Sequence, residues 1–208
     1  MEEKIYVLNH SSVKLMGEKV IYVDPYDLSN ATNDADYIFI THSHYDHFSP
    51  EDILKIAKEN TKLVVTEDLY AKSRELGFKK ENILSVLPNN NYQIDGIKFI
   101  TIPSYNNLKP FHPKKNNWVG YLIEINAKTY YIMGDTDKTL EAEKVKCDVL
   151  FIPVGGTYTM NYKEAAEVAN YIKPNLVVPI HYGSVVGTKK DAEEFTKLLK
   201  GVDYKILL

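Results

Sequence analysis

Three of the six histidines in this 208-residue chain fall within six positions, directly after a short apolar run. The stretch at 40–50 reads Ile-Thr-His-Ser-His-Tyr-Asp-His-Phe-Ser-Pro and contains His42, His44, Asp46 and His47. If the chain is still extended as it leaves a strand, His42 and His44 point to the same side and can share one cation. Imidazole and carboxylate suit zinc, and they suit iron, manganese or nickel nearly as well. The stretch therefore predicts a metal site at the end of a strand.

The residues after His44 are typical of a turn into a helix. Ser49 fits the N-cap and Pro50 the first helical position, and acidic residues follow in the first turn. A turn at this point can direct Asp46 and His47 toward a second cation beside the first. The alternative is a polar turn whose histidines only form hydrogen bonds, and the density of the motif argues against it.

Length and charge limit the partners of the chain. The length favours one domain over residues 1–208, long enough to bury a substantial core. The net charge is −3, no long run of like charges occurs, and Arg74 is the single arginine. The chain therefore offers no evident patch for a polyanion and no bidentate clamp for phosphate. We expect a small-molecule substrate and no nucleic acid as partner, and a homo-oligomer is left open.

The predicted location is the cytoplasm. The start of the chain, Met1 to Lys4, is acidic and lacks the basic beginning and apolar core of a signal peptide. No apolar stretch approaches the roughly 18 residues that a membrane span needs, so no membrane partner is expected. The single cysteine, Cys147, excludes an internal disulfide framework and fits a reducing compartment. We expect Cys147 to pack at the start of a strand rather than to react.

Apolar runs and turn signals predict two strand-rich halves. Strands are expected at 5–8, 12–16, 19–24, 37–40, 63–65, 83–87, 92–94, 97–102, 118–125, 129–133, 148–154, 176–180 and 204–208. Helices are expected at 50–59, from a Thr66 cap to a stop at Gly77, at 161–172 and at 188–200. An Asp95-Gly96 pair predicts a two-residue hairpin turn, and the proline- and asparagine-rich segment 103–117 predicts a long loop. The pattern favours an α/β (α+β) fold, a four-layer αββα sandwich of two mixed sheets flanked by helices.

Three later residues are candidates to complete the metal site. Asp135 and His181 each stand directly after a predicted apolar strand, as His42 does. A centre at the sheet edge would recruit them there, and Asp135 counts twice if its carboxylate bridges two ions. His112 lies in the predicted loop at 103–117. The alternatives are a turn residue for Asp135, a strand-end cap for His181 and an exposed loop histidine for His112, and we favour ligation for each.

Four other residues are candidates for contacts to a ligand or to substrate. His10 ends the first predicted strand and is a substitute ligand, a substrate contact or an ordinary loop residue. Asp24 is expected to orient a ligand histidine through a hydrogen bond. Asp137 is the alternative acid to Asp135 and is expected to contact a ligand rather than to be one. Tyr158 is a candidate substrate contact.

Taken together, these motifs closely resemble the metallo-β-lactamase fold superfamily. The matching residues are Thr-His-Ser-His-Tyr-Asp-His at 41–47, Gly-Asp-Thr-Asp at 134–137 and Pro-Ile-His-Tyr-Gly at 179–183. Val-Asp-Pro at 23–25 and Pro-Val-Gly-Gly-Thr-Tyr-Thr-Met at 153–160 look like its cytoplasmic branch, which contains metal-dependent hydrolases similar to ascorbate-phosphate lactonases. The resemblance extends over nearly the whole chain.

The resemblance implies a division of the ligands between two divalent ions. It gives His42, His44 and His112 to the first ion, Asp46, His47 and His181 to the second, and Asp135 as the bridge. Zinc is the expected metal, with manganese, iron or nickel as alternatives. The chain departs from the family in one place. Many members carry the third histidine almost immediately after the preceding strand, whereas eight residues separate Pro103 from His112 here.

The predicted reaction is hydrolysis. Two cations that share a water lower its pKa toward neutrality, so a metal-bound hydroxide is available at pH 7 to attack a small ester, lactone or amide. Asp46 or Asp135 would then carry the proton to the leaving group. The alternatives are a phosphodiesterase or ribonuclease of the same fold, an iron-dependent oxidoreductase on the same ligand set, and a metal-binding scaffold without catalysis.

Overall fold

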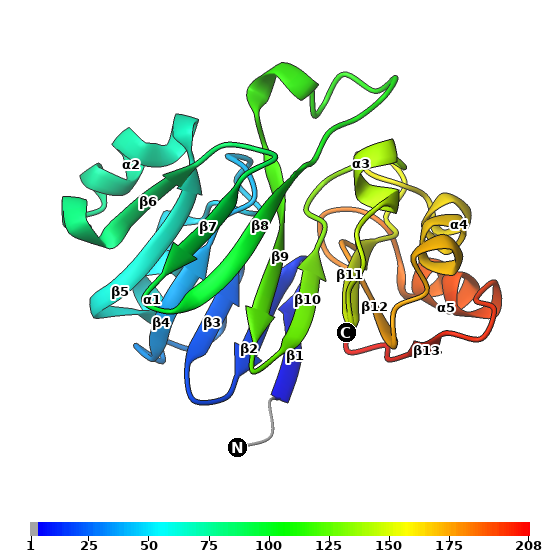
Figure 1. Cartoon of the computed structure of the whole chain (residues 1–208), viewed down its shortest axis with the longest axis horizontal. Helices are drawn as coiled ribbons and strands as arrows, with labels where there is room; N and C mark the ends of the chain where they lie inside the picture. The colour runs from blue at the N-terminus through cyan, green and yellow to red at the C-terminus, as the bar shows by residue number, and fades with distance from the viewer. Residues whose placement is uncertain (1–3) are drawn as a thin grey trace. The chain divides into compact units, whose positions relative to one another are not determined.

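The computed structural model describes residues 4–208 and divides into two compact units. Unit 1 is the chain as far as Val86 together with Leu208, and unit 2 is Leu87–Leu207. Each unit contains one mixed sheet with its own helices, as the sequence predicts (Figure 1). The expectation of a single domain over 1–208 stays a prediction. Within residues 4–208, no helix combines the length and the apolar character needed to cross a membrane.

Unit 1 is built on a six-stranded sheet whose spatial order follows the chain. Its strands are β1 (Lys4–Asn9), β2 (Ser12–Met16), β3 (Val20–Val23), β4 (Ala35–Phe39), β5 (Ala57–Thr66) and β6 (Ile83–Val86). The first three strands pair antiparallel, and β3 to β6 pair parallel. The predicted antiparallel opening, followed by alternation of strand and helix, is therefore confirmed.

The helices of unit 1 pack against its sheet. They are α1 (Pro50–Ile56) and α2 (Tyr70–Glu75), with the short 3-10 turns η1 (Glu67–Leu69) and η2 (Lys80–Asn82). Ile53 and Ile56 of α1 share a fully buried cluster with Ile38 and Leu63 of the sheet. Each such side chain contributes roughly 1.5–3 kcal/mol when it leaves water. This packing fixes α1 relative to the end of β4, and the histidine-rich motif at 42–47 lies in the short segment between them.

Helix α1 begins as predicted and ends earlier than predicted. Ser49 is the N-cap, and its side chain caps the helix backbone. The predicted end, residue 59, is wrong because the chain enters β5 at Ala57. The buried Thr61 hydroxyl donates to the carbonyl of Ala35 at 2.6 Å, which holds the start of β5 beside β4 instead of leaving it helical.

The helix predicted from a Thr66 cap to Gly77 is interrupted. Its first turn is the 3-10 turn η1, and α2 begins only at Tyr70. The Thr66 hydroxyl donates to the carboxylate of Asp68 at 2.6 Å and makes no capping bond to the backbone. Gly77 follows the end of the helix with a φ of 93°, a left-handed conformation that favours glycine, so the predicted stop is confirmed.

Unit 2 is built on a seven-stranded sheet in the order β13-β12-β11-β10-β9-β8-β7. Its strands are β7 (Asn91–Ile94), β8 (Ile97–Pro103), β9 (Val119–Ile125), β10 (Lys128–Ile132), β11 (Val149–Pro153), β12 (Leu176–Ile180) and β13 (Asp203–Tyr204). Strands β7 to β10 pair antiparallel, and β10 to β13 pair parallel. The hairpin between β7 and β8 turns at Asp95 and Gly96, both at positive φ, as predicted. The loop between β8 and β9 contains only the 3-10 turn η3 (Lys114–Asn116).

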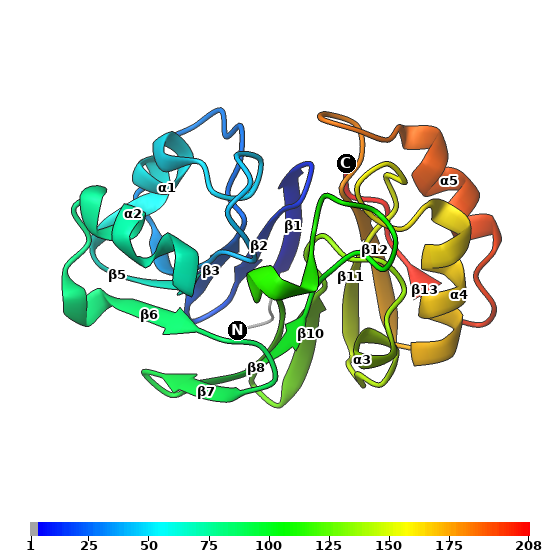
Figure 2. The ribbon, with the colours of Figure 1, turned by 90° about the horizontal axis from the view of Figure 1, so that it is seen from above.

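Two long helices accompany the parallel half of this sheet. Helices α4 (Tyr162–Ile172) and α5 (Lys189–Lys197) lie side by side and contact β11 and β12 (Figure 2). Asn161 and Thr188 cap them, each in a capping box with an acidic residue of the first turn. The sequence prediction misses the short α3 (Leu140–Glu143), although Thr139 caps it. The strand predicted at 204–208 is wrong beyond Tyr204, where β13 ends.

Cys147 packs directly before β11, at the predicted strand start. Its side chain is half-buried, and burial raises the pKa of the thiol to about 12. Because the thiolate is the reactive form, a thiol with this pKa is unreactive at neutral pH. The packing role expected for Cys147 therefore agrees with its surroundings.

Candidate metal centre

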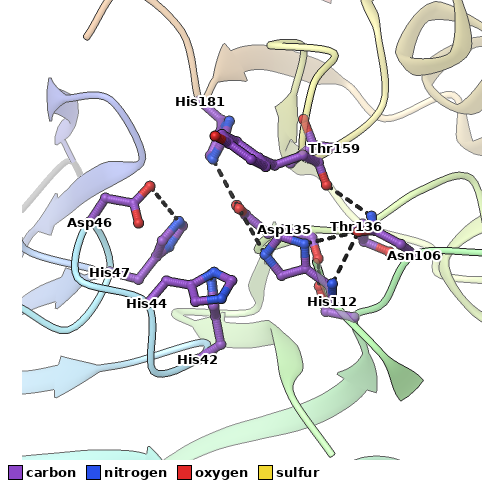
Figure 3. A network of polar contacts seen from close by, with 12 residues as sticks. His42, His44, Asp46, His47, Asn106, His112, Asp135, Thr136, Thr159 and His181 are labelled. Atoms are coloured by element: carbon purple, nitrogen blue, oxygen red, sulfur yellow. Dashed lines mark hydrogen bonds and ion pairs between the residues drawn. The ribbon is translucent and has the colours of Figure 1, made fainter. Parts of the chain in front are cut away.

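Unit 1 places His42 and His44 just past the end of β4 (Figure 3). The backbone N–H of Ile40 donates to the carbonyl of Val64 at 2.9 Å, so the chain stays attached to β5 up to the start of the motif. Beyond this point His42 Nε2 lies 3.1 Å from His44 Nδ1, with the ring centroids 4.7 Å apart. The two rings lie on one side of the chain, as the spacing predicts.

Asp24 holds the third histidine of the motif. Its Oδ2 lies 2.7 Å from Nδ1 of His47 and accepts a hydrogen bond of 2.7 Å from the Thr41 hydroxyl. The backbone N–H of Thr41 donates to Oδ1 at 2.8 Å, and all three residues are buried. Asp24 adopts a φ of 48° directly after β3, a conformation that these contacts stabilise. The carboxylate fixes the ring so that Nε2 of His47 faces away from it. The hydrogen bond between Asp24 and a histidine of the motif is the contact predicted from the sequence.

Asp46 lies between two histidines of unit 1. Its Oδ2 is 3.6 Å from Nε2 of His47 and 3.5 Å from Nε2 of His10. His10 is fully buried in the turn between β1 and β2, where its φ is 47°. His10 is therefore not an exposed loop residue. Its role as a ligand or a substrate contact stays a prediction.

A tight turn carries the motif into α1. The backbone N–H of Phe48 donates to the carbonyl of His44 at 2.8 Å. The carboxylate of Asp52 then accepts hydrogen bonds from the Ser49 hydroxyl and from two backbone amides of the loop that follows β3. Burial raises the pKa of Asp52, but these hydrogen bonds and Lys55 outweigh it and hold the pKa below its usual value. A charged Asp52 thus ties the helix start to the neighbouring loop.

Unit 2 gathers its three candidate ligands around one carboxylate oxygen. Asp135 Oδ2 lies 3.2 Å from Nε2 of His112 and 2.9 Å from Nε2 of His181. Figure 3 shows Asp135 with these two imidazoles directed at it. None of the three side chains is more than 3% exposed. These candidate ligands come from three separate segments, so the folding of unit 2 brings them together.

The position of His181 depends on a glycine that the sequence reasoning missed. His181 follows β12 with a φ of 59°. A Cβ at Gly155 would lie 2.3 Å from the carbonyl oxygen of His181 and 3.1 Å from its Nδ1. Only glycine allows the chain leaving β11 to pass this close. The available sequence signal was the Gly155-Gly156 pair directly after a predicted strand.

Asp137 and Tyr158, the other candidates of unit 2, contact residues of the loop between β8 and β9. Asp137 forms an ion pair of 2.6 Å with Lys109. The ring of Tyr158 packs edge-on against Phe111 at 4.7 Å between centroids. Asn106, which the sequence reasoning also missed, places its Oδ1 3.1 Å from Nδ1 of His112. The sequence of the loop does not show which of the two adjacent asparagines, Asn106 or Asn107, contacts His112.

The donor atoms fit a divalent metal ion by chemistry and by spacing. Two ligand atoms on a tetrahedral zinc, each roughly 2.0–2.1 Å from the ion, lie about 3.3 Å apart. In unit 1 the nitrogens of His42 and His44 are 3.1 Å apart. In unit 2 the oxygen of Asp135 lies 3.2 and 2.9 Å from two imidazole nitrogens. Within residues 4–208, these residues, together with His10, Asp46 and His47, form groups of side chains that could hold a metal ion.

Comparison with known proteins points to a family of metal-dependent hydrolases. A family model described as a β-lactamase superfamily domain matches residues 4–181. A UPF0173 metal-dependent hydrolase of Thermococcus onnurineus is 31% identical over 94% of this chain and 92% of its own length.

Two solved structures show the same fold. Igni18, a metallo hydrolase from Ignicoccus hospitalis, has a TM-score of 0.81 at 21% identity, covering 98% of this chain and 94% of its own. The metallo-β-lactamase fold protein YhfI from Bacillus subtilis has a TM-score of 0.75 at 13% identity, covering 98% and 96%. The predicted fold class, with two mixed sheets flanked by helices, is therefore confirmed.

Proposed function

This chain belongs to the β-lactamase superfamily, among its metal-dependent hydrolases, and from that premise we propose a dinuclear enzyme that hydrolyses a small ester, lactone or amide. The observation that carries the proposal is Asp135, a buried carboxylate oxygen with Nε2 of His112 at 3.2 Å and Nε2 of His181 at 2.9 Å. A carboxylate flanked by two ligand histidines suits a bridge between two adjacent ions.

The proposed ligands are the seven residues that the family resemblance implies. His42, His44 and His112 would hold one ion, Asp46, His47 and His181 the other, and Asp135 would bridge. The 3.1 Å spacing of His42 and His44 supports the first set. The hydrogen bond that Nδ1 of His47 donates to the Asp24 carboxylate supports the second, because ligand histidines ordinarily donate the other ring N–H to such a partner. Zinc is the proposed metal, with manganese, iron or nickel as alternatives.

The chemistry divides between the ions and the carboxylates. When bound, two such ions would lower the pKa of a shared water toward neutrality and polarise the substrate oxygen. Asp46 or Asp135 would take the proton released by the attacking water and deliver it to the leaving group. Asp24 keeps the His47 ring in one orientation, and Gly155 leaves room for His181. Tyr158, packed against Phe111, is the proposed substrate contact.

Charge supports a small substrate over a nucleic acid. The net charge is −3, and the single arginine, Arg74, lies in α2 and donates to the carbonyl of Phe78. A chain that binds a polyanion ordinarily presents a basic patch. The cytoplasm remains the proposed location, because a lone cysteine fits a reducing compartment.

Metal analysis joined to a substrate panel tests the proposal. Protein purified without added metal is analysed for zinc, manganese, iron and nickel, and is then assayed with esters, lactones, amides and phosphodiesters. We expect about two ions per chain, and turnover of an ester, lactone or amide that a chelator abolishes and added metal restores. His42→Ala should lower metal content and turnover together. Glu193→Gln, an exposed change on α5, should alter neither.

The other outcomes of this panel decide between the alternatives. Turnover of phosphodiesters alone would favour the phosphodiesterase or ribonuclease. Iron that changes its absorbance under a reductant, without hydrolysis, would favour the oxidoreductase. A fully metal-loaded protein that turns over no member of the panel would contradict the proposed hydrolysis and favour a metal-binding scaffold.

A further inference from the structure

His112 is the candidate ligand with the least regular surroundings. It lies in the long loop between β8 and β9, yet its side chain is 1% exposed and faces Asp135. A loop of this length does not by itself hold one side chain in one orientation. The contacts that surround His112 must therefore supply the rigidity that a strand end supplies for Asp135 and His181.

Asn106 supplies the nearest of these contacts. Its Oδ1 lies 3.1 Å from Nδ1 of His112 and accepts a hydrogen bond of 3.1 Å from the backbone N–H of the same residue. The backbone N–H of Asn106 donates in return to the carbonyl of His112 at 2.8 Å. One asparagine thus fixes both the backbone and the ring of His112.

The other end of the same amide is fixed by two acceptors. Asn106 Nδ2 donates to Oδ1 of Asp137 at 3.1 Å and to the backbone carbonyl of Tyr158 at 2.8 Å. A carboxylate and a carbonyl can only accept here, so the NH₂ group of the amide must face them. The amide oxygen must then face His112, and because it can only accept, Nδ1 of His112 must carry a proton. In the neutral ring this leaves Nε2 unprotonated and directed at Asp135, the form that binds a metal ion.

Asp137 is itself held in place by the loop. Its Oδ1 accepts from Lys109 Nζ at 2.6 Å, and its Oδ2 accepts from the backbone N–H of Asn107 at 3.0 Å. Lys109 also donates to the carbonyl of Thr159 at 2.6 Å. Asp137 therefore joins the turn after β10 to the loop that carries His112. Because its carboxylate can only accept, the Asn106 amide must turn its NH₂ group toward Asp137.

We propose that Asn106 and Asp137 are positioning residues that set the tautomer of His112, with Asp137 acting through the Asn106 amide. The proposal rests on the proposed function only in taking His112 as a metal ligand. Nothing in the relay requires a particular substrate. This chain of hydrogen bonds, the relay from Asp137 through Asn106 to His112, explains how a histidine in a long loop can be held as firmly as candidate ligands at strand ends. It also gives the carboxylate of Asp137 a role distinct from that of Asp135.

Zinc affinity of the full-length protein, measured by competition with a chromophoric chelator, is the first test. Loss of the hydrogen-bond partner of a ligand histidine typically costs roughly 10–100-fold in metal affinity. We expect that loss for Asn106→Ala. The matched control is Asn107→Ala, whose side chain donates to the carbonyl of Lys138 and does not contact His112 in any described hydrogen bond. The control should stay within about twofold of the wild type.

A paired exchange of amide and carboxylate separates the relay from simple loss of packing. Asn106→Asp alone sets two carboxylates against each other and should weaken zinc binding as much as Asn106→Ala does. Adding Asp137→Asn removes one of the two facing carboxylates, while the carbonyl of Tyr158 still faces the carboxylate at 106. We therefore expect the double variant to recover part, and not all, of the lost affinity. A double variant no better than Asn106→Asp would overturn the role given to Asp137.

The tautomer itself can be read in metal-free protein by nitrogen-15 NMR of the imidazoles, with His112 assigned by the signal missing from His112→Gln. We expect a protonated Nδ1 in the wild type and in Asn107→Ala. In Asn106→Ala the Nδ1 proton should be lost in favour of a protonated Nε2, because the Asp135 carboxylate 3.2 Å from Nε2 is then the acceptor beside the ring. This measurement decides the inference even if the protein hydrolyses nothing in the substrate panel, so the two failures are distinguishable. An Asn106→Ala protein with an unchanged tautomer and unchanged zinc affinity would overturn the inference.

Discussion

The two units place their candidate metal ligands in opposite ways. In unit 1, four candidates follow one another within residues 42–47, and a single strand end and a single turn place them all. In unit 2, His112, Asp135 and His181 come from a loop and two strand ends that lie far apart in sequence. The first arrangement depends on local backbone geometry, whereas the second depends on the correct folding of the whole sheet.

The difference extends to the residues that hold the ligands. Asp24 lies directly after β3, the strand that pairs with β4, and orients His47. It also accepts a buried hydrogen bond from the backbone N–H of Thr41, at the start of the motif. In unit 2 each candidate ligand is placed by a different residue. Asn106 forms a hydrogen bond with the ring of His112, and Gly155, which has no side chain, leaves room for the backbone of His181. A compact motif can share its supports, and dispersed ligands cannot.

The largest expected effect is the loss of the carboxylate that serves both histidines of unit 2. Asp135→Ala should abolish turnover and lower the zinc content of the protein more than His42→Ala does, because Asp135 is proposed to contact both ions. Zinc per chain after gel filtration, measured by mass spectrometry, checks this. Equal loss from both variants would break the proposed asymmetry between bridging and single ligands.

A smaller effect should follow from adding one methyl group beside His181. Gly155→Ala forces its Cβ against the backbone of His181, and overpacking of this kind costs about 1–3 kcal/mol of the free energy of unfolding. We expect it to lower zinc affinity as well, because His181 must move. Urea unfolding and zinc competition check the two effects together.

Gly77→Ala is the matched control for this change. A Cβ at Gly77 meets nothing within 4 Å, but its φ of 93° is strained for alanine. It should cost about 1–2 kcal/mol of stability and leave zinc affinity unchanged. If Gly155→Ala kept full zinc affinity, the close approach to His181 would have no role in placing that ligand.

The smallest expected effect is the pH dependence of stability at the start of α1. Burial raises the pKa of Asp52, but hydrogen bonds led by the Ser49 hydroxyl lower it further than burial raises it. A folded-state pKa below the unfolded value gives stability that is complete above about pH 4 and is lost as the pH falls through the folded value. Asp52→Asn should therefore lose less stability than the wild type between pH 6 and pH 3, by about 1 kcal/mol. Urea unfolding at both pH values measures the difference.

Asp148 of unit 2 is a carboxylate whose pKa is also lowered by hydrogen bonds, so it allows the same pH experiment in the other unit. The backbone N–H and the hydroxyl of Thr129 donate to Asp148 and hold its pKa below the usual value. Asp148→Asn should reduce the acid sensitivity in the same direction, with zinc affinity at pH 7 unchanged. A wild-type stability that is flat over this pH range would contradict both assignments.

The sequence predicts the parts of this molecule that depend on neighbouring residues. Ser49, Asn161 and Thr188 cap their helices, and Asp95-Gly96 makes the hairpin turn, because each acts over a few positions. The cluster at 42–47 is predictable for the same reason.

The errors arise where distant contacts override local preference. The end of α1 moves because Thr61 bonds to Ala35 in the neighbouring strand, and the relay from Asp137 through Asn106 to His112 exists only once the loop has folded. The clearance at Gly155 is likewise set by a residue 26 positions away, His181. Neither the periodicity of the sequence nor the residue types predict these contacts, so they become visible only in the folded structure.

X-ray diffraction from crystals of the zinc-loaded protein, collected on both sides of the zinc absorption edge, tests the central claim most directly. The account predicts two anomalous peaks on either side of the Asp135 carboxylate, one bound by His42 and His44 and the other by His47 and His181. A single peak, or peaks that Asp135 does not contact, would contradict it.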